Sequence, residues 1–174
     1  TPLEEALWVE AAERSDSLGV DIINSSLGYN TFQNSAYNYT YNDLDGKTSF
    51  IAQGLEMAFS KGMLIVNSAG NEGDDAWKYI ITPADAKNAL TVGAVDNVGI
   101  YAQFSSVGPT SDNRIKPNIV AQGSLAVVAY DTGVIATSNG TSFSAPIMSG
   151  LVACLWQALP SLSNKAIFDL VLSI

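Results

Sequence analysis

Continuous apolar runs of strand length constrain the fold of this sequence more than any other feature. The runs Met63–Val66 and Ala89–Val95 lack the in-and-out alternation of a strand with one wet face. Such strands are buried on both faces, which occurs almost only in parallel sheets covered by helices. A β-branched run, Val20–Ser26, precedes them. A helical pattern from Thr48 to Gly62 lies between this run and Met63–Val66. We therefore expect an α/β fold of three layers, with a mostly parallel sheet flanked by helices.

The first residues carry the signals of a helix start. Thr1 is a hydroxyl N-cap, Pro2 suits the first helical position, and Glu4 can close a capping box. The spacing predicts a helix to about Ser15, with Glu5 among the acids on its solvent face. We expect its buried face to carry Leu3, Leu7, Trp8, Val9 and Ala11.

The turn before a long apolar segment is the strongest candidate for a catalytic site. In Asn139–Pro146, Gly140 can take backbone angles closed to other residues and Pro146 is tolerated near a helix start. The turn then delivers Ser142 to a helix N-terminus, where unpaired amides and the helix dipole favour negative charge. Serine and threonine are also ordinary N-cap residues, and on spacing alone a structural role is favoured.

Asn71 is the second candidate. It lies on the glycine-flanked loop Ala69–Gly73, directly after the buried run Met63–Val66. A side-chain amide there can donate to charge developing on a substrate carbonyl, and one such donor is worth about 3 to 4 kcal/mol in the transition state. Considered by itself, an asparagine that tolerates a left-handed turn is the favoured alternative.

The sequence contains no histidine. A serine hydroxyl loses its proton as it attacks, and at neutral pH the usual acceptor is an imidazole. Acyl-transfer chemistry at Ser142 with a histidine base therefore needs a group from outside these 174 residues.

Composition excludes several classes of protein. Eight Lys and Arg against 17 Asp and Glu give a net charge of −9, which argues against a nucleic-acid partner. No apolar run reaches the roughly 18 to 20 residues that a membrane span needs. The single cysteine, Cys154, forms no intramolecular disulfide and is predicted to be a small buried thiol. At 174 residues the chain fits one domain with a real core.

Three blocks in order resemble the subtilisin-like serine peptidases. They are Ser26-Leu27-Gly28, Ala69–Gly73 and Gly140-Thr141-Ser142-Phe143-Ser144-Ala145-Pro146, which resemble the substrate strand, the oxyanion loop and the nucleophile motif. The resemblance covers nearly the whole chain and implies the carboxyl-terminal half of a catalytic domain. Residues 1–174 would be a single partial domain, incomplete at its amino-terminal side. Ser142 would be the nucleophile, and its backbone N–H and the Asn71 amide would bind the oxyanion.

The resemblance also implies a cleft for a peptide or protein substrate. The peptide would lie antiparallel to the substrate strand, adding one strand to the sheet. A rough alignment on Thr82-Pro83-Ala84 places an isoleucine near the floor of the pocket for the residue before the scissile bond, so apolar or aromatic residues are expected there rather than Lys or Arg. The implied substrate-binding residues are Ser26, Leu27, Gly28, Ser68, Ala69, Gly70 and Ile81.

In the family the catalytic Asp and His lie on blocks that would precede Thr1. We therefore expect an upstream segment of the same protein to carry them, and the isolated chain to be inactive. Without that segment, the strands Val20–Ser26 and Met63–Val66 would present an open flank that promotes self-association.

The family resemblance further implies a secreted or cell-surface protein, no cofactor for catalysis and, in many members, a structural calcium ion. Asp43 and Asp45 suggest a calcium-binding turn, but a full loop needs more oxygen ligands, and a solvated turn is favoured. The metal ligands are not determined by the sequence.

Two other functions stay open. A sedolisin-type acid serine peptidase uses Glu in place of His, but that family has Asp at the oxyanion position where this chain has Asn71. A non-catalytic pseudoprotease domain would keep the cleft for binding peptides.

Overall fold

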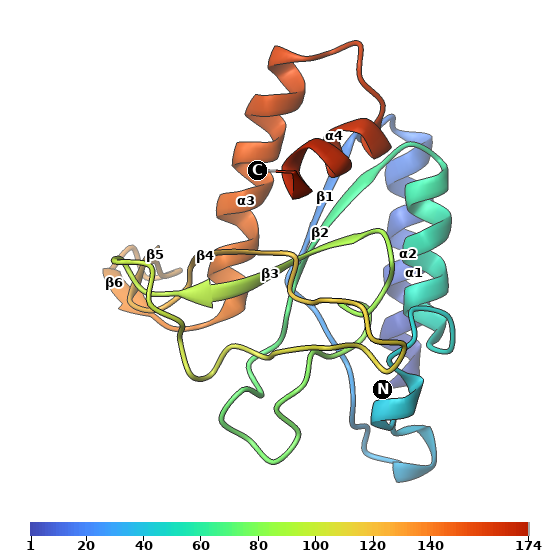
Figure 1. Ribbon diagram of the computed structural model, residues 1–174, viewed down its shortest axis with the longest axis vertical. Helices are drawn as coiled ribbons and strands as arrows, with labels where there is room; N and C mark the ends of the chain where they lie inside the picture. The colour runs from blue at the N-terminus through green and yellow to red at the C-terminus, as the bar shows by residue number, and fades with distance from the viewer. Residues whose placement is uncertain (174) are drawn as a thin grey trace.

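A four-stranded parallel sheet forms the centre of the computed structural model, which describes residues 1–173 (Figure 1). Strands β2 and β3 occupy the middle of the sheet and are almost entirely buried, as their continuous apolar runs predict. The order is β1-β2-β3-β4 and every neighbouring pair is parallel. The strands are β1 (Ile22–Ser25), β2 (Leu64–Ser68), β3 (Ala89–Val95) and β4 (Ile119–Gln122).

Helices cover the sheet on both sides and complete the expected layered α/β fold (Figure 1). On one side α1 (Pro2–Ser17) packs against α2 (Phe50–Ser60). On the other side α3 (Thr141–Ala158) crosses all four strands. The last helix, α4 (Asn164–Leu172), lies against the end of α2, where the rings of Phe59 and Phe168 meet edge-on with centroids 5.7 Å apart.

Smaller elements lie outside the main sheet. Two short 3-10 helices, η1 (Ser35–Tyr37) and η2 (Tyr41–Asp43), interrupt the polar segment between β1 and α2. The strands β5 (Ala126–Ala129) and β6 (Ile135–Ser138) form an antiparallel hairpin that leads into α3. In the part of the chain that the structure describes, no helix is both long enough and apolar enough to cross a bilayer.

The predicted buried face of α1 is right for Trp8, which is buried, and for Val9, which is partly buried against the core, but it is wrong for Leu3, Leu7 and Ala11. Leu3 and Leu7 are 64% and 51% exposed, whereas Glu5 is buried with Trp8 and Ala12. Both polar groups on the buried face have partners: Trp8 Nε1 donates to Ser25 Oγ at 3.1 Å, and Glu5 accepts a hydrogen bond from a tyrosine hydroxyl. Because buried polar groups cost little once they are hydrogen-bonded, tertiary partners decided which side of α1 faces the core.

Cys154 is exposed, which also contradicts the prediction. Val152 is the residue of this part of α3 that is fully buried, and Cys154 follows it by two positions. Two residues correspond to about 200° of rotation around an α-helix, so the two side chains point to opposite sides.

The predicted open flank is also only half right. The structure pairs β2 on both sides, with β1 and with β3, so the run Met63–Val66 is not at an edge. Strand β1 lies at one edge of the sheet and β4 at the other. Strand β4 begins at Ile119; before it, Lys116 is buried and Ile115 is exposed.

Tyr39 ties the polar segment between β1 and α2 to helix α1. Its hydroxyl lies 3.0 Å from each carboxylate oxygen of Glu5. Burial raises the pKa of Tyr39 to about 12, and the hydrogen bond to Glu5 and the negative charge of Glu5 act in the same direction. Burial likewise raises the pKa of Glu5 above its ordinary value.

We expect the Tyr39 phenol to stay protonated in the folded protein until about pH 12. Its folded pKa lies above the unfolded value near 10, so its contribution to stability is complete below about pH 10 and is lost as the pH rises through 12. An ultraviolet titration of the wild type minus that of Tyr39→Phe measures this phenol alone. A difference curve with a midpoint near pH 10 would contradict the assignment.

Candidate active site

The candidate site lies where the carboxyl ends of β1 and β2 meet the first turn of α3. Parallel strands end at the same edge of a sheet, and sites of open α/β folds gather outside that edge. Ser26 follows β1, Asn71 follows β2, and Ser142 is in the first turn of α3. Direct hydrogen bonds connect the three segments, so the structure brings together the residues that the sequence singled out.

Thr141 orients the carboxamide of Asn71. Its backbone N–H donates to Asn71 Oδ1 at 2.8 Å, and its hydroxyl donates to the same oxygen at 3.0 Å. The Asn71 Nδ2 end is therefore turned toward Gly140, 3.8 Å from where a Cβ on that glycine would lie. Thr141 is fully buried, which holds this geometry.

Two N–H donors are left free at this point. Among residues 1–173, neither Asn71 Nδ2 nor the backbone N–H of Ser142 donates a hydrogen bond. Ser142 N is at the amino end of α3, where the helix dipole favours negative charge, and Asn71 Nδ2 lies beside Gly140, the N-cap residue of that helix. The arrangement can bind an oxyanion formed at the half-buried Ser142.

Pro146 explains the contact between Ser26 and Ser142. Proline has no backbone N–H, so the carbonyl of Ser142, four residues earlier in α3, lacks its helical donor. Ser26 Oγ donates to this carbonyl at 3.1 Å. The proline thus couples the segment after β1 to the turn that carries Ser142.

The loop Ala69–Gly73 is held by close contacts that require glycine. Gly70 has a φ of +111°, and a Cβ there would overlap Glu72 Oε2 and lie 2.8 Å from Ser106 Oγ. Ser106 Oγ donates to the Glu72 carboxylate at 2.8 Å and accepts from the Glu72 N–H at 3.0 Å. The pair Glu72 and Ser106 was not identified from the sequence, because these residues are far apart in the chain.

Asn67 is another residue that sequence reasoning missed. It is fully buried in β2, and its Nδ2 donates to Ser68 O at 2.8 Å and to Leu27 O at 3.3 Å. It therefore joins the two segments that follow β1 and β2. The signal was a polar residue directly after the apolar run Met63–Val66.

Two of the predicted pocket residues are hydrogen-bonded to the first turn of α3: Ser26 Oγ donates to Ser142 O, and Gly70 N donates to Thr141 Oγ1 at 3.3 Å. Ser68, Ala69 and Ile81 are buried, Gly28 is partly buried and Leu27 is 51% exposed. Ile81 N donates to Ala69 O at 3.2 Å, so the Ile81 segment follows the loop after β2.

No general base accompanies the candidate nucleophile in residues 1–173. No described side chain is hydrogen-bonded to Ser142 Oγ, and the sequence contains no histidine. Ser144, the second serine of the motif, is buried and donates to Ala121 O at 3.1 Å, so it has a structural role.

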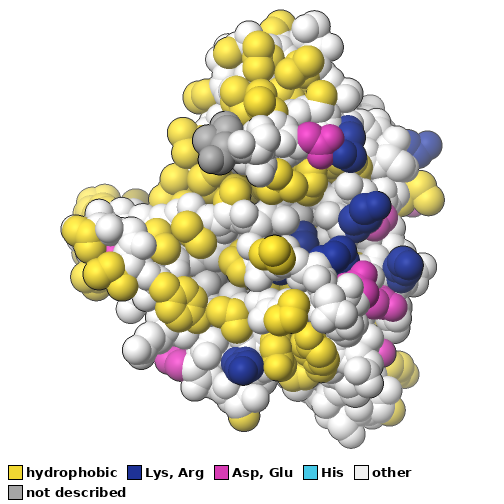
Figure 2. All heavy atoms as spheres, viewed as in Figure 1, with side chains coloured by type: hydrophobic (Ala, Val, Ile, Leu, Met, Phe, Trp, Pro, Cys, Tyr) yellow, Lys and Arg dark blue, Asp and Glu magenta, His cyan; other side chains and the backbone are white. Residues whose placement is uncertain are grey.

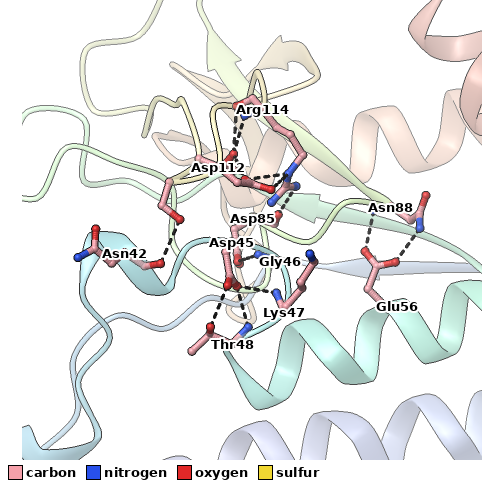
Figure 3. Close-up of polar contacts among 12 residues, drawn as sticks. Asn42, Asp45, Gly46, Lys47, Thr48, Glu56, Asp85, Asn88, Asp112 and Arg114 are labelled. Atoms are coloured by element: carbon pink, nitrogen blue, oxygen red, sulfur yellow. Dashed lines mark hydrogen bonds and ion pairs between the residues drawn. The ribbon is translucent and has the colours of Figure 1, made fainter.

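The acidic turn at Asp43 and Asp45 does not fit a calcium ion. Asp45 accepts hydrogen bonds from the backbone N–H groups of Lys47 at 2.8 Å and Thr48 at 2.7 Å (Figure 3). Asp43 accepts from Thr40 N at 2.7 Å. Burial raises the pKa of Asp45, but these hydrogen bonds outweigh it and leave the pKa below its ordinary value. Within the described residues, no three or more Asp, Glu, His or Cys side chains gather as metal ligands.

A neighbouring cluster joins three loops of this region (Figure 3). Asp85 is buried and accepts from Gly46 N at 2.7 Å, and Arg114 Nη1 donates to Asp85 O at 2.6 Å. Arg114 Nε also pairs with the Asp112 carboxylate at 2.8 Å. Burial raises the pKa of Asp85 above its ordinary value. The cluster anchors the loop that begins directly after Ile81.

Comparison with known proteins finds one family over almost the whole chain. The model of the subtilase family matches residues 2–173. Subtilisin DY from Bacillus licheniformis is 30% identical over 160 residues, which are 91% of this chain and 51% of that protein. M-protease from Shouchella clausii (strain KSM-K16) is 36% identical over 117 residues, which are 67% of this chain and 28% of that protein.

Solved structures agree with the sequence comparison. S41 psychrophilic protease superposes with a TM-score of 0.73 at 27% identity, over 97% of this chain and 53% of its own. Sphericase superposes with a TM-score of 0.71 at 31% identity, over 95% of this chain and 52% of its own. The chain thus spans about half the length of both structures and of subtilisin DY.

The link between Ser26 and Pro146 predicts a measurable coupling. Ser26→Ala should lower the free energy of unfolding by about 1 kcal/mol, because it leaves the Ser142 carbonyl without its donor. In a Pro146→Ala background the amide of residue 146 restores the helical hydrogen bond, so the same substitution should cost less, with a coupling of about 0.5 to 1 kcal/mol.

Urea unfolding of the two single variants and the double variant measures this coupling. Ser163→Ala is the control, because its hydroxyl caps α4 and its cost should not depend on residue 146. Additive costs for Ser26→Ala and Pro146→Ala would show that the proline does not create this contact.

Proposed function

This chain belongs to the subtilase family, and we propose from this membership that it is the nucleophile-bearing half of a serine endopeptidase domain. The observation that carries the proposal is the Asn71 carboxamide, held by Thr141 with its Nδ2 free beside the first turn of α3. Ser142 is then the nucleophile, and Ser142 N and Asn71 Nδ2 are the donors for the oxyanion.

The proposed reaction is acyl transfer through Ser142. Its Oγ attacks the carbonyl carbon of the scissile peptide bond, the Oγ proton passes to a base, and the carbonyl electron pair moves to the oxygen. The two free N–H donors stabilise this oxyanion. When the intermediate collapses, the C–N bond breaks, the amine leaves with the proton from the base, and water later hydrolyses the acyl-enzyme.

The substrate side of the proposal rests on β1, an edge strand of the sheet. An extended peptide can pair with the free edge beyond it at Ser26–Gly28, so that main-chain hydrogen bonds provide affinity. The hydrogen bond from Ser26 Oγ to Ser142 O supports this position of the peptide, because it joins the edge to the residue proposed as the nucleophile. A peptide on the edge would run directly past Ser142.

The base and its orienting carboxylate come from an upstream segment of the same protein in this proposal. The absence of histidine and the half-length match to relatives support it. Apolar side chains on α1 and α3 provide a surface for that segment: Leu3 and Leu7 on the first helix, and Ile147 and Leu151 on the second, at 44% and 57% exposed. Secretion or a cell-surface location belongs to the same proposal, and no step uses a metal.

The missing histidine equally favours a pseudoprotease that binds peptides without cleaving them. Activity of the longer polypeptide distinguishes the two functions. We expect residues 1–174 alone not to cleave a chromogenic peptide, and addition of the upstream segment, in cis or in trans, to restore cleavage. Cleavage by the isolated chain, or none by the longer polypeptide, would overturn the proposed division of the domain.

In the active polypeptide, Asn71→Ala should lower kcat by about 100- to 1,000-fold with little change in KM, because its amide acts on charge that develops in the transition state. Ser142→Ala should abolish the acyl-enzyme. Asn42→Ala, at an exposed asparagine in the short 3-10 helix η2, is the matched control. An unchanged kcat for Asn71→Ala would remove Asn71 from the oxyanion site.

The exposed apolar surface of α3 also predicts self-association of the isolated chain. Sedimentation should show an average mass that rises with concentration, and Leu151→Glu should lower it by placing charge on this surface. Val127→Glu, at a side chain of the β5–β6 hairpin that is 74% exposed, should have no such effect. A wild-type chain that stays monomeric at every concentration would contradict the assignment of this surface.

A further inference from the structure

Ile81 fills the space between the two segments that follow β1 and β2. These strands pair as far as Ser25 and Asn67, and the chain beyond them forms the two walls of the proposed pocket. A Cβ on Gly28, in the first wall, would lie 2.5 Å from Cδ1 and Cγ1 of Ile81. A Cβ on Gly70, in the second wall, would lie 3.0 Å from the same Cγ1. One side chain therefore reaches the glycine of both walls.

The backbone on both sides of Ile81 is held in place. Ile81 N donates to Ala69 O at 3.2 Å, and Tyr29 N donates to Thr82 O at 2.8 Å. Ile81 is 9% exposed, and its β-branched side chain has few accessible rotamers. The side chain thus has little freedom to swing out of the space between the walls.

The preceding residue, Ile80, has a different environment. It is fully buried in a separate cluster with Leu44, Ala69 and Ala84. Successive side chains of an extended segment point to opposite faces, which explains why only Ile81 lies against Gly28. The pair Ile80 and Ile81 therefore offers a matched test of position with identical chemistry.

We infer that Ile81 restricts the substrate residue before the scissile bond to a small apolar side chain such as that of alanine. The inference rests on the proposed function, in which a peptide along Ser26–Gly28 places this side chain between the two walls. It narrows the expectation drawn from the sequence, which included aromatic residues. A phenylalanine or lysine side chain would need the volume that the carbons of Ile81 occupy, and close packing makes such displacement costly.

Binding of product-like peptides tests this without any need for catalysis. We would titrate the 174-residue chain with acetylated tetrapeptides that are identical except for a last residue of Ala, Phe or Lys. The terminal carboxylate of each can accept from Asn71 Nδ2 and Ser142 N. Calorimetry should show that the Ala peptide binds at least about tenfold tighter than the Phe or Lys peptide, since single methylenes in tight pockets already change selectivity by this factor.

Variants at Ile81 should change the preference in steps. Ile81→Val removes Cδ1 and should improve binding of the Phe peptide. Ile81→Ala removes Cγ1 as well and should lower the Ala-to-Phe affinity ratio by about tenfold or more. Ile80→Val removes the same methyl group from the neighbouring residue and should leave the ratio unchanged. Circular dichroism checks the fold of each variant, and Ile81→Val provides the test if Ile81→Ala does not fold.

The outcomes separate this inference from the proposed function. Two results overturn the inference alone, provided that Asn71→Ala weakens the binding of every peptide. One is a wild-type preference for the Phe or Lys peptide. The other is an Ala-to-Phe affinity ratio that is unchanged from the wild type in both Ile81 variants. If no peptide binds, or if Asn71→Ala changes nothing, the proposed cleft is wrong and the inference is overturned with it.

Discussion

The hydrogen bonds from Thr141 to the carboxamide of Asn71 are the interaction on which the candidate site depends. They join the first turn of α3 to the loop after β2 at distances of 2.8 and 3.0 Å. Because both bonds end on the oxygen, the nitrogen of the same amide remains available to a ligand. A single buried threonine thus fixes the position and the polarity of the donor beside Ser142.

The rest of the fold supports this junction. Helix α3 crosses all four strands of the parallel sheet, so its first turn is held at the carboxyl edge (Figure 1). Pro146 frees the Ser142 carbonyl for Ser26, and Gly70 allows the Asn71 loop to approach Glu72 and Ser106. Rigid elements position the candidate groups, while the loops between them carry the chemistry.

The surface of the molecule fits the idea of a divided catalytic domain. The view in Figure 2 shows hydrophobic side chains gathered in several exposed areas, with few charged groups among them. Exposed apolar residues of α1 and α3, a sheet edge at β1 and a candidate nucleophile without a base fit the proposal that this chain functions with a further segment. In that proposal the chain holds the oxyanion and substrate groups, and the further segment carries the proton-transfer groups.

Local patterns in the sequence were sufficient for the parallel sheet, because continuous apolar runs report burial on both faces. The approach of Asn71 to the first turn of α3 was predicted only through the resemblance to the subtilisin-like peptidases, since α3 follows the β5–β6 hairpin and not a strand of the parallel sheet. Tertiary structure alone decided that Glu5 is buried on α1 while Leu3 and Leu7 are exposed, and that Cys154 is exposed. Each of these depends on partners distant in the chain, such as Tyr39 for Glu5, and periodicity contains no information about partners that only folding brings into contact.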